Sequence, residues 1–271
     1  MDPFHGRSRV RLRGPTQGMK ANPEKPPSRK SGLRFGASDY ANSVPLLYCL
    51  KQVMPEARLI KRVPSAMPGL LHDKKVDIAL VPVGALVGDR KLDWIPGVGV
   101  CAKTVVRSVL IKLHKPLKQV VRVRMDAASR TSNALARILL TQRYGLKVEM
   151  VNPSEPGPVD AEVMIGDRAL RSEPARCGDL DMAKEWKAMT GLPFVFAVWA
   201  CRAGDPRKAE YTRMVRRVCD AGVAALPEII AVESCRLGLS RKRCEEYFSK
   251  CIHYKLGRRE TQAIALFSSM L

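Results

Sequence analysis

The stretch Arg34–Pro45, Arg-Phe-Gly-Ala-Ser-Asp-Tyr-Ala-Asn-Ser-Val-Pro, decides how the rest of the sequence is interpreted. Leu33–Ala37 predicts a short apolar strand, and Asn42 or Ser43 then predicts the cap of a helix. Pro45 suits the first turn of that helix, because a missing N–H costs nothing there. Such a helix directs free backbone N–H groups and the positive end of its dipole beyond the sheet edge. The pattern indicates a carboxylate site, although an ordinary helix cap in an α/β protein has the same pattern.

A second stretch repeats this design. The strand predicted at Lys118–Met125 leads into Asp-Ala-Ala-Ser-Arg-Thr-Ser-Asn, and an apolar helix is predicted at Ala134–Tyr144. Ser129, Thr131 and Ser132 supply three hydroxyls within four positions, which is more than a helix cap needs. We therefore favour a second carboxylate site over a simple cap.

Two further polar residues interrupt or follow apolar strands. Ser108, beside Arg107, interrupts the apolar run Val105–Leu113. Such an interruption is typical either of an edge strand or of a ligand contact. Asp167 follows the strand predicted at Ala161–Ile165, where it would either bind a ligand hydroxyl or lock a turn through backbone N–H groups. The residues alone leave both alternatives open.

Short apolar runs alternate with longer helical patterns from residue 33 onwards, which predicts α/β units with largely parallel strands. Ligands of open α/β sheets gather at the carboxyl ends of the strands, so a ligand between two such sets is expected. We expect a disordered basic leader at 1–30 and a first lobe at 31–107. A second lobe is expected at 108–198, with hinge strands at Ser108–Lys112 and Phe194–Ala200. Helices at 199–271 are expected to return to the first lobe.

Composition narrows the class of protein. The 271 residues are 46% apolar, enough to bury a substantial core. No apolar run approaches the roughly 18 residues of a membrane span, and the amino terminus lacks the apolar segment of a secretory signal. We therefore expect a cytoplasmic protein without a membrane partner.

The formal net charge is +21, which is typical of proteins that bind nucleic acid, membrane surfaces or small anions. The first 30 residues hold eight Lys or Arg and two acids, so about +15 belongs to the rest. These basic residues are spread over predicted helices without the interleaved aromatic residues of a single-strand binder. We therefore expect no nucleic-acid partner.

The eight cysteines and four histidines form no cluster with metal-ligand spacing, so no metal site is expected. Cys219, Cys244 and Cys251 stand among apolar residues, which favours buried, reduced thiols.

Four segments together resemble the chorismate dehydratase family of the futalosine menaquinone pathway: Arg34–Pro45, Ser129–Leu140, Ile165–Leu170 and, most specifically, Thr190–Trp199, Thr-Gly-Leu-Pro-Phe-Val-Phe-Ala-Val-Trp. The similarity covers about residues 32–265. It implies an α/β, two-lobed fold like that of type 2 periplasmic-binding proteins, with the ligand cleft between the lobes. It also implies a lyase that removes water from chorismate to give 3-[(1-carboxyvinyl)oxy]benzoate without a cofactor.

The resemblance also assigns roles. Asn42 and Ser108 become the catalytic candidates, and Ser43 lies beside Asn42 as a substrate contact. By the resemblance, Ser129, Thr131 and Ser132 would hold a carboxylate, and Asp167, from its place at the strand end, is a further candidate substrate contact. A non-catalytic binding protein of the same fold, for an aromatic or dicarboxylate ligand, is the alternative.

Overall fold

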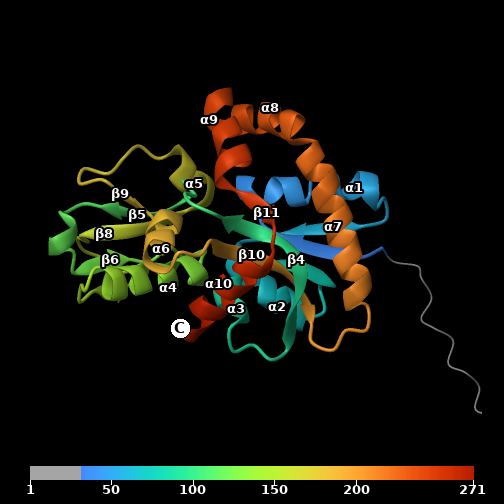
Figure 1. Cartoon of the computed structure of the whole chain (residues 1–271), viewed down its shortest axis with the longest axis horizontal. Coiled ribbons are helices and arrows are strands. Elements are labelled where there is room, and N and C mark those ends of the chain that lie inside the picture. The colour runs from blue at the N-terminus through green and yellow to red at the C-terminus, as the bar shows by residue number, and fades with distance from the viewer. Residues whose placement is uncertain (1–31) are drawn as a thin grey trace, which may run out of the picture. The chain divides into compact units, whose positions relative to one another are not determined.

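The computed structural model describes residues 32–271, whose strands form two separate sheets (Figure 1). The expected basic leader at 1–30 lies outside these described residues. The first sheet contains β1 (Arg34–Ala37), β2 (Arg58–Lys61), β3 (Ile78–Pro82), β4 (Leu92–Ala102), β10 (Phe194–Arg202) and β11 (His253–Lys255). Their order across the sheet is β11-β4-β10-β3-β1-β2.

The second sheet has five strands in the order β7-β6-β8-β5-β9. Its members are β5 (Val109–Leu113), β6 (Arg122–Arg124), β7 (Glu149–Val151), β8 (Ala161–Ile165) and β9 (Asp179–Asp181). β5 pairs only within this sheet, and β10 pairs only with β3 and β4 of the first sheet. The chain therefore passes between the sheets at residues 103–108, and it returns before β10.

The expectation of largely parallel strands is wrong for part of each sheet. β1 runs parallel to β2 and β3, and β6 runs parallel to β7 and β8. β10, however, is inserted antiparallel between β3 and β4, and β5 is antiparallel to β8 and β9. Both strands follow a passage from the other sheet rather than a helical crossover within one sheet, so the parallel rule for βαβ units does not apply to them.

Helices cover both sheets. Near the first sheet lie the 3₁₀ helices η1 (Ala41–Leu46) and η2 (Pro64–Ala66), with α1 (Leu50–Val53), α2 (Met67–His72) and α3 (Val83–Leu86). The second sheet carries the 3₁₀ helix η3 (Leu117–Gln119), α4 (Arg130–Ile138), the π-helix η4 (Leu139–Arg143), α5 (Gly166–Arg171) and α6 (Met182–Thr190). After β10 come α7 (Lys208–Ala224), α8 (Leu226–Leu237), α9 (Arg241–Glu246), the π-helix η5 (Tyr247–Cys251) and α10 (Arg258–Ser269).

The late helices return to the first sheet, where α7 packs against β4 and η1, and α10 packs against β10 (Figure 1). None of the helices described here is both long and apolar enough to cross a membrane.

The strand predicted at Phe194–Ala200 is confirmed as β10, which lies inside the first sheet and within the core. Every residue of β10 is buried except Ala197 and Arg202, which are half-buried. Phe194 packs edge-on against Trp186 and Phe267, with ring centroids 5.3 and 5.1 Å away. Aromatic pairs in this geometry add to the free energy gained from burial alone. The three thiols of Cys219, Cys244 and Cys251 are also buried, and each is free.

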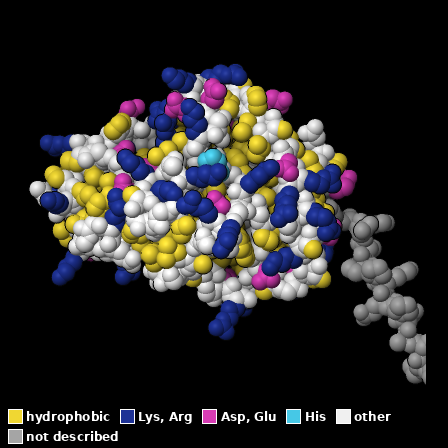
Figure 2. Space-filling view, viewed as in Figure 1, with side chains coloured by type: hydrophobic (Ala, Val, Ile, Leu, Met, Phe, Trp, Pro, Cys, Tyr) yellow, Lys and Arg dark blue, Asp and Glu magenta, His cyan; other side chains and the backbone are white. Residues whose placement is uncertain are grey.

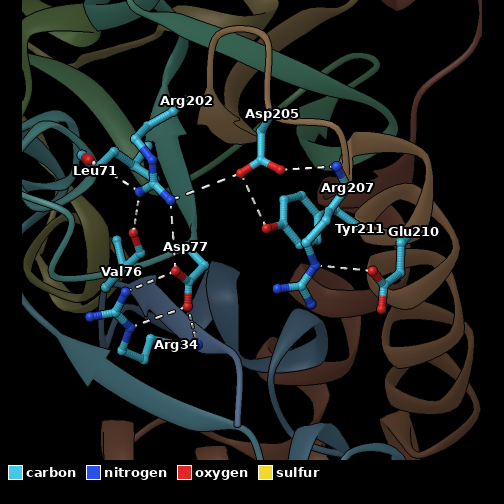
Figure 3. Close-up of polar contacts among 9 residues, drawn as sticks. All are labelled: Arg34, Leu71, Val76, Asp77, Arg202, Asp205, Arg207, Glu210 and Tyr211. Atoms are coloured by element: carbon cyan, nitrogen blue, oxygen red, sulfur yellow. Dashed lines mark hydrogen bonds and ion pairs between the residues drawn. The ribbon is translucent and has the colours of Figure 1, made fainter. Parts of the chain in front are cut away.

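A polar network joins the start of β1, the residues just before β3, the end of β10 and the start of α7 (Figure 3). Arg34 donates from Nε and Nη2 to the two carboxylate oxygens of Asp77, at 3.2 and 2.9 Å, and the Arg34 backbone N–H donates to the same carboxylate. Arg202 donates to the carbonyl of Val76 at 2.9 Å and approaches Asp77 at 3.7 Å. Burial would raise the pKa of Asp77, but the bonds from Arg34 outweigh burial and lower it.

Replacing Asp77 with Asn should lower the free energy of unfolding by about 1–3 kcal/mol at neutral pH, because Arg34 loses a charged acceptor. The lowered pKa means that the carboxylate stabilises the fold above the ordinary Asp pKa of about 3.9. That contribution is lost as the pH falls through the folded-state pKa, so urea denaturation of wild type and Asp77→Asn should converge in acid. Asp73→Asn removes an exposed carboxylate and is the control, with a change below about 0.5 kcal/mol. A difference that persists unchanged in acid would contradict this account.

A close contact between α7 and η1 holds the polar stretch around Asn42 and Ser43 in place. Gly222 of α7 lies against η1, and a Cβ added there would lie only 1.8 Å from the carbonyl oxygen of Pro45. No side chain fits in that space, so the glycine permits α7 to support η1 directly.

Gly222→Ala should therefore destabilise the protein by about 1–3 kcal/mol through overpacking, and it should displace η1. Gly69→Ala is the matched control, because an added Cβ in α2 meets no atom within 4 Å. That control should be neutral or stabilise by up to about 1 kcal/mol. Urea denaturation measures both, and equal stability of the two variants would show that η1 does not depend on the α7 contact.

Candidate active site

The helix predicted in the stretch Arg34–Pro45, the first polar motif, starts earlier in the sequence than expected. The prediction that Asn42 or Ser43 caps the helix is wrong: η1 begins at Ala41, and Tyr40 is its N-cap without a side-chain cap bond. Tyr40 has an extended backbone, and its carbonyl accepts from the Ser43 N–H at 2.9 Å, which closes the first 3₁₀ turn. Asn42 and Ser43 thus lie within the first turn, where the Ser43 hydroxyl donates to the Asn42 Oδ1 at 3.2 Å.

The second polar motif contains a helix cap, and its helix starts at Arg130 rather than at Ala134. Ser129 is the N-cap, since its Oγ accepts from the Ser132 N–H at 3.0 Å. The Ser129 hydroxyl also donates to the Ser132 Oγ at 2.9 Å. The third hydroxyl, Thr131 Oγ1, accepts from the backbone N–H of Gly84 in α3, at 2.9 Å. One hydroxyl of the three therefore joins the two lobes.

The two motifs open onto one small cavity between the sheets, which we name the inner cavity. Five of the seven residues singled out in the sequence line it: Asn42, Ser43, Ser129, Thr131 and Ser132. Apolar residues of both sheets complete the walls, namely Leu80, Val100, Val109, Ile165 and Phe196. Its volume is about 50 Å³. This volume holds no more than a few waters, whereas ligand sites occupy about 300–1,000 Å³. The lobes are therefore closed.

The other two predicted site residues, Ser108 and Asp167, do not line the inner cavity. Ser108 is fully buried just before β5, and its Oγ accepts from the hydroxyl of Tyr247 at 2.8 Å. Burial raises the pKa of Tyr247 well above its ordinary value, so this phenol is a neutral donor.

Asp167 occupies the first turn of α5 and binds two partners outside that helix. Its Oδ1 accepts from the Ala41 N–H at the start of η1 at 2.8 Å, and its Oδ2 accepts from Arg236 of α8 at 2.7 Å. The carboxylate thus accepts from a backbone N–H that the sequence pattern predicts to face a ligand. Tyr247 and Arg236, which fix Ser108 and Asp167, were missed in the sequence, where nothing in the local pattern of α8 or η5 marks them.

The inner cavity is polar but almost without titratable groups. Among its lining residues, all of which lie in the described part of the chain, Tyr40 alone carries a titratable side chain. Burial raises the pKa of Tyr40, and the nearby carboxylates of Asp126 and Asp167 raise it further. The phenol is therefore neutral near pH 7. Within residues 32–271, no group of three or more His, Cys, Asp or Glu side chains has the geometry to hold a metal ion.

Basic side chains are distributed over the surface. Figure 2 shows Lys and Arg scattered across the viewed face, interspersed with acidic side chains, rather than gathered over one element.

Comparisons with known proteins agree with this architecture. A family model described as menaquinone biosynthesis matches residues 33–271. The chorismate dehydratase of Campylobacter jejuni subsp. jejuni is 28% identical over 242 residues, covering 86% of this chain and 95% of that protein. The chorismate dehydratase of Thermus thermophilus is 28% identical over 239 residues, covering 79% and 86%.

Solved structures are similar in fold. A protein from Archaeoglobus fulgidus matches with a TM-score of 0.68 at 15% identity, covering 90% of this chain and 97% of that one. The periplasmic aliphatic sulphonate-binding protein of Escherichia coli matches with a TM-score of 0.59 at 15% identity, covering 88% and 85%. The expected α/β, two-lobed fold like that of type 2 periplasmic-binding proteins is confirmed. Because the family model extends over nearly all described residues, the chain belongs to the menaquinone biosynthesis family.

Proposed function

We propose that this protein is a chorismate dehydratase, a carbon–oxygen lyase of the cytoplasm that acts in menaquinone biosynthesis by the futalosine route. One observation carries the proposal: in a member of the menaquinone biosynthesis family, two polar helix starts from different lobes, those of η1 and α4, line the same small cavity. The likeness to chorismate dehydratases over most of the chain supports it.

The chemistry suits such a cavity. Chorismate is a dicarboxylate, and loss of its C4 hydroxyl with the C3 proton leaves an aromatic ring. The reaction is strongly downhill, so the protein needs mainly to orient the substrate and to stabilise the developing charge. Backbone and hydroxyl donors at the starts of η1 and α4 supply hydrogen bonds to carboxylates without placing a fixed charge in the cavity.

The departing hydroxyl requires a donor, and Asn42 is the lining residue best placed for that role. Its Oδ1 accepts from Ser43, which orients the amide so that its Nδ2 can donate. Ser108 is the second catalytic candidate from the sequence, but its hydroxyl bonds to Tyr247 and it does not line the cavity. The geometry therefore favours Asn42 for catalysis and leaves Ser108 as part of the passage between the lobes.

No carboxylate, imidazole or amine lines the inner cavity to act as a general base. The proton from C3 then passes to water or to the enolpyruvyl carboxylate of the substrate itself. The substrate enters only when the lobes separate, since the closed cavity of about 50 Å³ excludes it. Reclosure expels water around the reacting diene, and opening for product release is a candidate for the slow step.

The decisive experiment mixes purified protein with chorismate and follows the loss of diene absorbance. The expected product is lighter than chorismate by one water and is identified by mass as 3-[(1-carboxyvinyl)oxy]benzoate. Saturable chorismate binding without product would instead support a non-catalytic binding protein of the same fold. Unchanged chorismate without binding would reject both functions.

Asn42→Ala should lower kcat by about 100-fold or more, as expected for removing a donor to a developing charge. Its midpoint of urea denaturation should stay near that of wild type, because the Asn42 side chain bonds only to the neighbouring Ser43 among the described residues. Asn152→Ala, at an exposed loop position away from the cavity, is the control and should keep full activity. Wild-type turnover in Asn42→Ala would remove Asn42 from the mechanism.

A further inference from the structure

A second and larger space adjoins the inner cavity, and we name it the outer pocket. Its volume is about 520 Å³, which falls in the range of small-molecule sites. Tyr40 and Ile165 line both spaces, so these two side chains form the partition between them. The outer pocket is therefore the space immediately outside the closed cavity.

The ring of Tyr40, in the partition, packs closely against the backbone of Gly166. Gly166 has a φ of +64°, and a Cβ added there would lie 3.0–3.1 Å from three carbons of the Tyr40 ring. The ring thus packs directly on the Gly166 backbone. Tyr40 comes from the first lobe and Gly166 from the second, so separation of the lobes would remove this contact and join the two spaces.

The charges in the outer pocket are unequally paired. Three of its four carboxylates pair with a Lys or Arg, as Asp39–Lys61, Asp126–Arg168 and Asp167–Arg236, and the fourth, Glu162, lies 3.7 Å from a ring nitrogen of His114. Among the residues described, two lining arginines, Arg124 and Arg171, have no acidic partner within 4.0 Å.

These two guanidinium groups keep donor capacity. Arg124 donates from Nη2 to the carbonyls of Glu155 and Gly157, and its buried Nε has no partner in the described chain. Arg171 makes one long bond, from Nε to the Asp167 carbonyl at 3.3 Å. Two arginines without acidic partners in one pocket match a ligand that bears two carboxylates, since guanidinium binds carboxylate through parallel donors.

We propose that the outer pocket is a docking site for a dicarboxylate, in which the substrate binds before the lobes admit it to the inner cavity. This inference rests on the proposed function for the identity of that substrate. Arg124 and Arg171 hold its carboxylates, and Tyr40 blocks its further passage until the lobes separate. The arrangement keeps cations outside the inner cavity while still concentrating an anionic substrate at its entrance.

The first test uses Arg171, because Arg124 also holds two loop carbonyls. In Arg171→Gln, kcat/KM for chorismate should fall about tenfold at low ionic strength while kcat stays unchanged, and the loss should shrink at high salt. Arg213→Gln is the matched control, since it removes the same charge from an exposed position of α7 away from both spaces. Equal effects of the two variants, or a fall in kcat for Arg171→Gln, would overturn the docking role.

A second test does not depend on turnover. Isophthalate is a stable aromatic dicarboxylate, and calorimetry should show that it binds wild type and Arg213→Gln but binds Arg171→Gln about tenfold more weakly. Benzoate, with one carboxylate, should bind wild type more weakly than isophthalate. Isophthalate affinity that is independent of Arg171 would reject the pocket as a dicarboxylate site. Arg171-dependent binding in a protein that leaves chorismate unchanged would reject the proposed reaction and retain the pocket.

Discussion

The carboxylate of Asp167 connects three parts of the chain at the candidate site. It lies at the start of α5 in the second lobe, and it accepts from the Ala41 backbone in the first lobe and from Arg236 in α8. Each oxygen serves one partner, so the amide at the start of η1 is satisfied without any ligand. Two further hydrogen bonds support the closed lobes, from Gly84 to Thr131 and from Tyr247 to Ser108. The size of the inner cavity follows from these contacts.

Closure separates two kinds of polar group. Neutral donors and acceptors from η1 and α4 face the inner cavity, whereas arginines and carboxylates surround the outer pocket. A fixed charge in a small cavity shielded from bulk water would cost several kcal/mol unless it were paired. Hydroxyls and amides avoid that cost, and they can still stabilise a carboxylate or a departing hydroxyl once the substrate has replaced water. A dehydration that ends in an aromatic ring suits this division, because it requires orientation more than strong acid–base groups.

The two-lobed fold by itself does not determine whether the protein binds a ligand or catalyses a reaction. Solved structures with the same two-lobed fold include a sulphonate-binding protein, so the fold is compatible with binding alone. The chemistry depends instead on the side chains placed around the passage between the sheets. α7 contributes indirectly, because Gly222 allows it to support η1 at a distance that no other residue permits.

The sequence by itself determined the features that arise from neighbouring residues. Its apolar runs predicted β1, β5, β6, β8 and β10, and its short polar residues marked both η1 and α4, because periodicity and capping act over a few positions. Only the tertiary structure decided that Ala41 starts η1, that β10 inserts antiparallel, and that Asp167 and Ser108 bond to protein groups. The Asp167 bond to Ala41 spans 126 positions of the sequence, and the Ser108 bond to Tyr247 spans 139. A contact over that separation depends on how the lobes pack, and local sequence patterns carry no signal of it.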